Sequence, residues 1–257
     1  MHGLAQLLPS RKRKRQSRER IAMELADTAV YAVGDVHGCL DELLRLEEMI
    51  AADGAALPSP KLIVMLGDYV DRGPSSSQVL EHLLAPPPEG FERICLAGNH
   101  ELAMLDYLEG RIGLSDWLRM GAAPTLISYG IDHERLRAIH GTGIGADRTI
   151  RNTIPAGHVA LLRSLPVMVT LSRFVFVHAG IRPELDLDRQ SDADLVSIRD
   201  DFYRRGHLLG NYVVHGHTPV TRATRYGARI NIDTGAYYSG RLTALRVWRG
   251  RGRYLTT

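Results

Sequence analysis

The stretch Gly67-Asp68-Tyr69-Val70-Asp71-Arg72-Gly73 follows the apolar run Lys61-Leu62-Ile63-Val64-Met65-Leu66. The run shows no helical period and contains β-branched residues, which is typical of a strand buried on both faces. It ends on a glycine, after which two carboxylates and a guanidinium follow within five positions. Charged groups at the mouth of a core need a metal, a phosphate or an ion-pair partner beside them. The stretch therefore predicts a functional site at the end of a buried strand.

Five further apolar runs end in the same way, with polar residues directly after a short strand-like segment. In open α/β sheets, ligands bind beyond the carboxyl ends of the strands, so these ends should converge on one crevice. The polar blocks are Gly34-Asp35-Val36-His37-Gly38, Gly98-Asn99-His100-Glu101, His178-Ala179-Gly180, His215-Gly216-His217-Thr218 and Asp233-Thr234-Gly235.

The order of the segments predicts the architecture. Helical periodicity follows each of the first three strand-like runs, 29–33, 61–66 and 94–97. Residues 111–165 then contain only short helical segments separated by Gly and Pro, which indicates a helical insert. A later helix, 194–203, carries Arg199. Strands return at 167–171, 174–177, 212–214, 228–232 and 241–248. This α/β order predicts two mixed sheets packed together with helices outside.

The 257 residues fit one catalytic domain, 26–257, preceded by a basic tail, 1–25. Residues 1–20 hold seven Arg or Lys against one Glu. A flexible solvated tail, with a short helix through Ile21, Met23 and Leu25, is favoured over a nucleic-acid contact because no aromatic residue interrupts the basic run.

Cysteine usage and hydropathy point to the cytoplasm. Two cysteines, Cys39 and Cys95, do not form a disulfide framework and suit a reducing compartment. No apolar run approaches the roughly 18 residues needed to span a bilayer. The N-terminal apolar residues also precede the basic cluster, the reverse of a secretory signal. We therefore expect a soluble, cytoplasmic protein without membrane partners.

The strand ends carry the ligand types of a dinuclear metal site. Two neighbouring divalent ions need a shared anionic ligand, further carboxylate or imidazole ligands, and open positions. Asp35 and His37 alternate by two and could point the same way, and Asp68 is expected to bridge. Oxygen and nitrogen ligands without thiolate favour a catalytic site over structural zinc, with Mn favoured and Fe or Zn as alternatives. The other candidate ligands are Asn99, His178 and His217.

The blocks at 34–38, 67–73, 98–101, 178–180 and 216–219 resemble the signature blocks of the PPP family of metallophosphatases. Asp233-Thr234-Gly235 resembles the bacterial branch, which includes the phage lambda phosphatase and a Rhizobiales-like group. The resemblance covers about residues 28–248 and implies the calcineurin-like metallophosphoesterase fold, with two mixed sheets between helices (α/β/β/α). It also implies that one metal is held by Asp35, His37 and Asp68, and the other by Asp68, Asn99, His178 and His217.

The resemblance further implies the roles of the catalytic residues. A bridging hydroxide would attack phosphorus in line. His100, oriented by Asp71, would protonate the leaving oxygen, and Arg72 would bind the phosphoryl oxygens bidentately. Arg199 is expected as the second phosphate-binding arginine, although an ordinary salt bridge is the alternative role for it. The alternative candidates for the second arginine are Arg182 and Arg205.

The favoured function is hydrolysis of phosphomonoesters on protein Ser or Thr side chains, with Tyr as a further option. The alternative is a symmetrical diadenosine tetraphosphate hydrolase, whose first block and following helix resemble residues 34–50. Asp71 together with Glu101 favours the protein phosphatase, because those hydrolases usually lack the acid before the arginine. A non-catalytic protein that docks on nucleic acid is disfavoured, since every ligand and acid position is filled. Phosphorylated proteins or peptides are the expected partners, with small phosphoesters and dinucleotide polyphosphates as alternatives.

Overall fold

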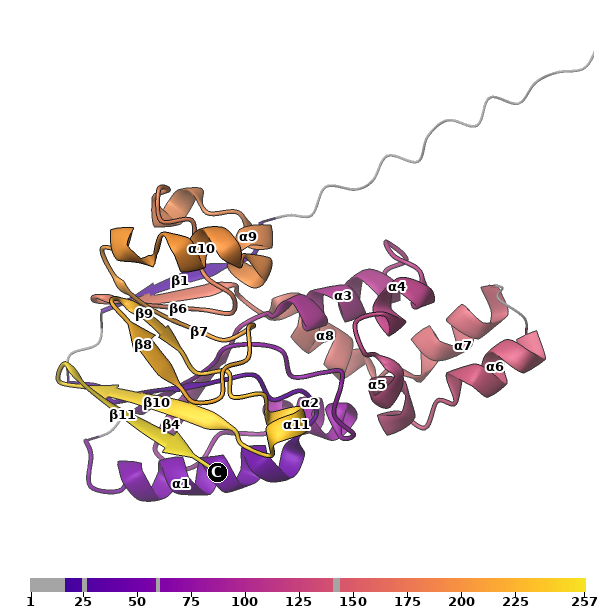
Figure 1. Ribbon diagram of the computed structural model, residues 1–257. Coiled ribbons are helices and arrows are strands. Elements are labelled where there is room, and N and C mark those ends of the chain that lie inside the picture. The colour runs from indigo at the N-terminus through magenta and orange to yellow at the C-terminus, as the bar shows by residue number, and fades with distance from the viewer. Residues whose placement is uncertain (1–16, 25–26, 59–60, 141–143) are drawn as a thin grey trace, which may run out of the picture.

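Two β-sheets lie face to face with helices on their outer faces in the computed structural model, which describes residues 17–24, 27–58, 61–140 and 144–257 (Figure 1). The predicted α/β fold is confirmed. The six-stranded sheet contains, in order, β1 (Arg20–Met23), β5 (Met168–Leu171), β6 (Phe174–Val177), β7 (Tyr212–His215), β9 (Arg229–Asn231) and β8 (Thr224–Tyr226). The five-stranded sheet contains β11 (Arg251–Thr256), β10 (Thr243–Trp248), β2 (Val30–Val33), β3 (Lys61–Met65) and β4 (Phe91–Cys95).

Alternating side chains of each central strand fill two separate cores. In β2, Val30 and Ala32 belong to the core between the sheets, together with Phe176 of the other sheet. Tyr31 and Val33 belong to the core between the sheet and its covering helices. Because a strand exposes successive side chains to opposite faces, burial on both sides requires a continuous apolar run. This requirement explains why β2 and β3 were recognisable in the sequence.

Helices cover both outer faces. Figure 1 shows α1 and α2 beside the five-stranded sheet, and α9 and α10 beside the six-stranded sheet. The bounds of these and the other helices of the body are α1 (Leu40–Gly54), α2 (Ser76–Leu84), α3 (Asn99–Leu108), η1 (Leu187–Arg189), α9 (Asp192–Ser197), α10 (Asp200–Arg204), η2 (Gly206–Leu208) and α11 (Ala236–Ser239).

The expected helical insert lies to one side of the sheets (Figure 1). Trp117 and Leu126 of the insert are fully buried and join the main helix-side core. The insert is therefore packed onto the body, close to α3 and α2, which its helices contact. Its helices are α4 (Leu114–Leu118), α5 (Ala123–Ser128), α6 (His133–His140), α7 (Ile144–Thr153) and α8 (Ala156–Ser164).

Two local expectations were wrong. The helix expected through Ile21 and Met23 is instead β1, which pairs in parallel with β5 at the edge of the sheet. The helix expected over 194–203 is broken at Ile198 and Arg199 into α9 and α10, because neither residue has helical dihedral angles. The remainder of the expected flexible tail, residues 1–16 and 25, lies outside the described residues.

Candidate metal centre and active site

Parallel strands deliver the polar blocks to one edge of the two sheets. β2, β3 and β4 run parallel, as do β6, β7 and β9, so that their carboxyl ends lie side by side. The expected ligands follow these ends directly, and Asn99 is the first residue of α3. Five of the six are almost completely buried: Asp35, His37, Asp68, His178 and His217. The sheets therefore bring together residues that are up to 182 positions apart in sequence.

One group of potential ligands surrounds His178. Its Nε2 lies 3.1 Å from Asn99 Oδ1, 3.2 Å from His217 Nδ1 and 3.3 Å from Asp68 Oδ2. The Asp68, His178 and His217 ligand atoms lie within 4.8 Å of one another, close enough to hold one ion. This is the second set of ligands that the resemblance implied.

A second group shares Asp68. Asp68 Oδ2 lies 3.5 Å from His37 Nε2 and 3.9 Å from His100 Nε2, and these three residues could also hold an ion. The compact triple thus contains His100 where Asp35 was expected. Asp35 is nevertheless adjacent, because its Oδ2 accepts a hydrogen bond from the His217 backbone N–H at 3.0 Å.

Orphaned polar atoms show that the residues fit divalent cations. Asp35 Oδ1 and His37 Nε2 are buried without a hydrogen-bond partner. An unpaired carboxylate oxygen and an unpaired imidazole nitrogen are costly in a protein interior, and cation coordination would compensate both. The donor set of carboxylates, imidazoles and an amide also suits Mn, Fe or Zn. The two buried groups are therefore consistent with a dinuclear metal site, and the identity of the metals is open.

The protonation states agree with this fit. Burial lowers the pKa of His37 to about 3, and burial with the neighbouring His178 lowers that of His217 to about 3, so both rings are neutral at pH 7. Burial, followed by the charges of Asp233 and Asp68, raises the pKa of Asp35 well above its ordinary value. Packed carboxylates that repel one another in this way require positive charge nearby.

Tight backbone turns make this clustering possible. His37, Asp68 and His217 have positive φ angles of 45°, 54° and 68°, a region that side-chain-bearing residues rarely adopt. Gly98 and Gly216 let the chain approach the ligands, since a Cβ would lie 2.2 Å from Asp68 Oδ1 at Gly98 and 1.9 Å from Asp35 Oδ1 at Gly216. Neither glycine can be replaced without displacing a carboxylate.

Glu101 holds the turn after β3 in shape. Its buried carboxylate accepts hydrogen bonds from the backbone N–H groups of Gly98, Asp68, Tyr69 and Val70, at 2.7 to 3.2 Å. Burial raises its pKa to about 7, whereas N–H donors favour the ionised form. The contacts fix the position of Asp68 relative to α3, a role that the sequence did not reveal.

His100 and Asp71 form a hydrogen-bonded pair. His100 Nδ1–H donates to Asp71 Oδ2 at 2.7 Å, which leaves Nε2 facing the metal groups. Burial disfavours the protonated imidazole, but the charges of Asp68 and Asp71 outweigh burial and raise the pKa of His100. The pair therefore has the arrangement of an acid oriented by a carboxylate.

Two arginines reach the site and two do not. Arg72 Nη2 lies 3.1 Å from His100 Nε2, and Arg199 Nε donates to His217 Nε2 at 3.0 Å. Arg182 is instead paired with Asp194 at 2.8 Å. The remaining alternative, Arg205, pairs with Glu184 at 3.3 Å. Position therefore favours Arg199 as the second phosphate-binding arginine.

Replacing Arg199 with Lys tests this choice. A lysine keeps the charge but cannot bind two phosphoryl oxygens in one plane. We expect kcat/KM to fall about 10- to 100-fold, corresponding to the roughly 1.5–3 kcal/mol of a charged hydrogen bond. Arg182→Lys and Arg205→Lys are matched controls, and an equal loss in either would contradict the special role of Arg199.

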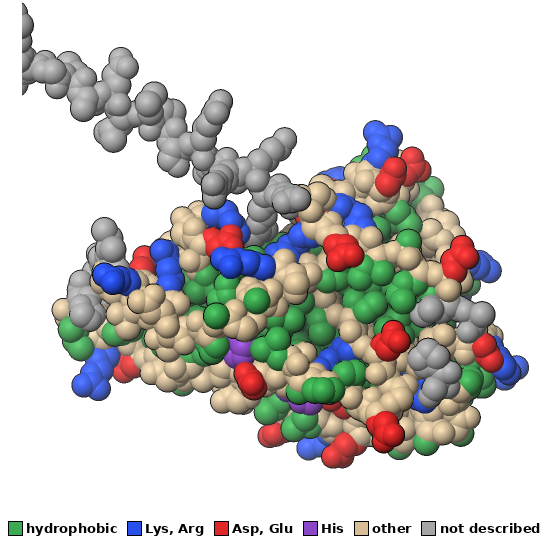
Figure 2. Space-filling view, turned by 180° about the vertical axis from the view of Figure 1, so that it is seen from behind, with side chains coloured by type: hydrophobic (Ala, Val, Ile, Leu, Met, Phe, Trp, Pro, Cys, Tyr) green, Lys and Arg blue, Asp and Glu red, His purple; other side chains and the backbone are tan. Residues whose placement is uncertain are grey.

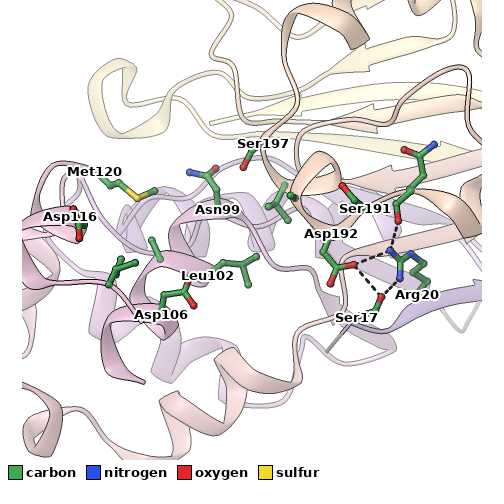
Figure 3. Close-up of a pocket in the computed structure, with 15 residues that line it drawn as sticks. Ser17, Arg20, Asn99, Leu102, Asp106, Asp116, Met120, Ser191, Asp192 and Ser197 are labelled. Atoms are coloured by element: carbon green, nitrogen blue, oxygen red, sulfur yellow. Dashed lines mark hydrogen bonds and ion pairs between the residues drawn. The ribbon is translucent and has the colours of Figure 1, made fainter. Parts of the chain in front are cut away.

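A cleft of about 750 Å³ opens beside the metal groups at Asn99. Figure 3 shows Asn99 at its centre, with Met120 and Asp116 of the insert on one side and Asp192 on the other. Leu102 of α3 also lines it. The cleft therefore lies between the insert and α9 and reaches the metal groups at Asn99.

Comparison with known proteins identifies the family. Residues 28–246 match the model of the calcineurin-like phosphoesterase family. The chain belongs to this family. The phosphoesterase is accordingly metal-dependent and hydrolyses phosphoric ester or anhydride bonds. Among the described residues, no helix is long and apolar enough to cross a bilayer.

Curated relatives carry the name bis(5'-nucleosyl)-tetraphosphatase PrpE [asymmetrical]. The phosphoesterase is 27% identical over 235 residues to the protein from Bacillus cereus (strain 03BB102), covering 83% of this chain and 88% of the relative. It is 28% identical over 236 residues to that of Halalkalibacterium halodurans, with the same coverage. These names specify asymmetrical hydrolysis, whereas the sequence suggested a symmetrical hydrolase as the alternative.

Solved structures share the fold. A proposed diadenosine tetraphosphatase matches 94% of this chain and 98% of its own with a TM-score of 0.65 at 19% identity. A cold-active protein-tyrosine phosphatase of a Shewanella species matches 90% of this chain and 82% of its own, with a TM-score of 0.51 at 20% identity. At these identities the likeness establishes the fold of the phosphoesterase.

Proposed function

We propose that the phosphoesterase hydrolyses phosphomonoesters of protein Ser and Thr side chains. The observation that carries this proposal is the His100–Asp71 pair, 2.7 Å apart beside Arg72. A serine or threonine alkoxide is a poor leaving group and needs a proton as the P–O bond breaks, so a positioned acid matters most for such esters.

In this proposal each site residue has a defined task. Arg72 and Arg199 bind the phosphoryl oxygens, and His100 Nε2–H gives its proton to the leaving oxygen as a new P–O bond forms to water and the old one breaks. Two divalent cations, when bound, would supply Lewis-acid activation of water and neutralise phosphoryl charge. The residues proposed to hold them are Asp35, His37, Asp68, Asn99, His178 and His217.

The second candidate is a dinucleoside polyphosphate hydrolase. The names of the sequence relatives favour it, and the matches to them cover 83% of this chain. In such a substrate the leaving group is a phosphate chain, which is far less basic than an alkoxide and depends less on a general acid.

A purely nucleic-acid-docking role has less support. The face of the molecule in Figure 2 intersperses acidic with basic side chains around apolar patches, so this face offers no continuous basic surface to a phosphate backbone. Buried orphaned ligand atoms also serve no purpose in such a protein.

A side-by-side assay separates the two enzymatic candidates. Protein stripped with a chelator and reloaded with Mn²⁺ is given phosphoserine, phosphothreonine and phosphotyrosine peptides and diadenosine tetraphosphate. We expect the stripped protein to be inactive, Mn²⁺ to restore turnover, and kcat/KM to be highest for the phosphoserine or phosphothreonine peptide. A higher kcat/KM for diadenosine tetraphosphate would replace the proposal with the second candidate, and unequal cleavage products would identify the asymmetrical reaction.

A further inference from the structure

Three residues of the helical insert form hydrogen bonds with Asp71 and Arg72. Trp117 Nε1–H, from α4, donates to Asp71 Oδ2 at 3.1 Å. Thr125 Oγ1–H, from α5, donates to Asp71 Oδ1 at 2.8 Å. Between the two helices, the Gly121 carbonyl accepts the Arg72 backbone N–H at 2.9 Å. The insert thus binds both the side chain and the backbone of this pair.

The pair needs such support because its backbone is strained. Asp71 and Arg72 have φ angles of 70° and 69°, so two consecutive side-chain-bearing residues are left-handed. Such conformations persist only where the surroundings over-determine them, and they concentrate at functional sites. Thr125 contributes again here, because its Oγ1 accepts the Asp71 backbone N–H at 2.8 Å.

Trp117 is placed to orient the carboxylate that orients His100. Both the indole N–H and His100 Nδ1–H donate to the same oxygen, Asp71 Oδ2. Trp117 is fully buried and stacks on Tyr107, with ring centroids 5.2 Å apart and planes at 27°. The indole therefore cannot turn away, and the Asp71 carboxylate is fixed by one donor on each oxygen in addition to His100.

We propose that Trp117 and Thr125 are positioning residues for proton transfer by His100, so that the insert is part of the catalytic machinery. This inference rests on the proposed role of His100 as the acid. Without the indole N–H, the carboxylate gains rotational freedom and His100 Nε2 is less accurately aimed. The rate of the step in which the leaving oxygen is protonated therefore decreases, whereas phosphate binding is unchanged.

The test compares Trp117→Phe on two small esters in the Mn²⁺-loaded enzyme. Phenylalanine keeps an aromatic ring against Tyr107 but removes the N–H donor. We expect kcat for phenyl phosphate, with its basic leaving group, to fall about tenfold, part of the 10²–10⁴ that a general acid supplies. For p-nitrophenyl phosphate, whose leaving group needs little protonation, we expect kcat to fall by less than about twofold. KM should stay constant for both esters.

Matched variants make the result decisive. Trp248→Phe removes the other indole donor of the chain, which binds Asp27 far from the site, and should change neither ester. Thr125→Val should reproduce the selective decrease in kcat for phenyl phosphate. Thr125→Ser keeps the hydroxyl and should retain the parent's kcat for both esters. If Trp117→Phe fails to fold, the comparison of Thr125→Val with Thr125→Ser provides the test. An equal loss on both esters in Trp117→Phe and Thr125→Val would overturn the inference.

The same assay separates this inference from the proposed function. If His100→Asn itself affects both esters equally, the acid role of His100 fails and the proposed function loses its support. If His100→Asn is selective for phenyl phosphate while Trp117→Phe and Thr125→Val are not, only the positioning role is wrong.

Discussion

Asp68→Asn should lose metal-supported turnover almost completely. Asp68 Oδ2 is the atom that both potential metal groups share, 3.3 Å from His178 Nε2 and 3.5 Å from His37 Nε2. A neutral amide offers one oxygen, and Asp68 Oδ1 is already occupied by the His100 backbone N–H at 3.1 Å. The loss should exceed the 10–100-fold that is typical of mutating a group behind a metal ligand.

Metal content gives a readout of Asp68→Asn that does not depend on activity. After loading with Mn²⁺ and removal of free ion, elemental analysis should find fewer ions per chain than in the parent protein. Asp188→Asn, at an exposed carboxylate outside both groups, should retain the parent's ions and kcat. An Asp68→Asn protein that keeps two ions and normal kcat would remove Asp68 from its bridging role.

His100→Asn should lower kcat for phosphoserine and phosphothreonine peptides by roughly 10²–10⁴, the usual contribution of a general acid. The substitution removes the ring nitrogen that faces the metal groups while Asp71 and Arg72 remain in place. The decrease should shrink as the leaving group becomes less basic, and a series of substituted phenyl phosphates measures that dependence.

A control variant and a metal measurement are needed to interpret His100→Asn. His207→Asn, at an exposed histidine of η2, should leave kcat unchanged. Because His100 also belongs to one potential metal group, metal content must be measured in the same preparation. A variant with full metal content that hydrolyses the most basic leaving group as fast as the parent would exclude His100 as the acid.

The buried strands could be predicted because their sequences are distinctive. β2 and β3 face apolar cores on both sides, and such burial requires continuous apolar runs. β1, β8 and β11 were missed because they lie at sheet edges, where solvent accepts charged and polar side chains. An edge strand therefore leaves little hydrophobic signal.

The candidate ligands could be predicted because each follows a buried strand, whereas the residues that support Asp71 could not. Trp117 and Thr125 lie 46 and 54 positions from Asp71, and their contacts depend on how the insert packs. No local pattern marks such long-range hydrogen bonds. Arg199 was expected on a continuous helix, whereas the chain breaks before α10, and Arg199 Nε donates to His217 Nε2 there. Its role in phosphate binding stays a prediction.

The parallel pairing of β1 with β5 determines which N-terminal truncations keep the sheet intact. β1 is the end strand of its sheet, and Ile21 and Met23 pack against the core between the sheets. A fragment starting at residue 26 would expose the N–H and C=O groups of β5 along a flat border, a ready template for strand exchange between molecules. Fragments that retain residues 17–24 keep this border closed, and self-association of shorter ones would reflect the lost strand and not the chemistry of the site.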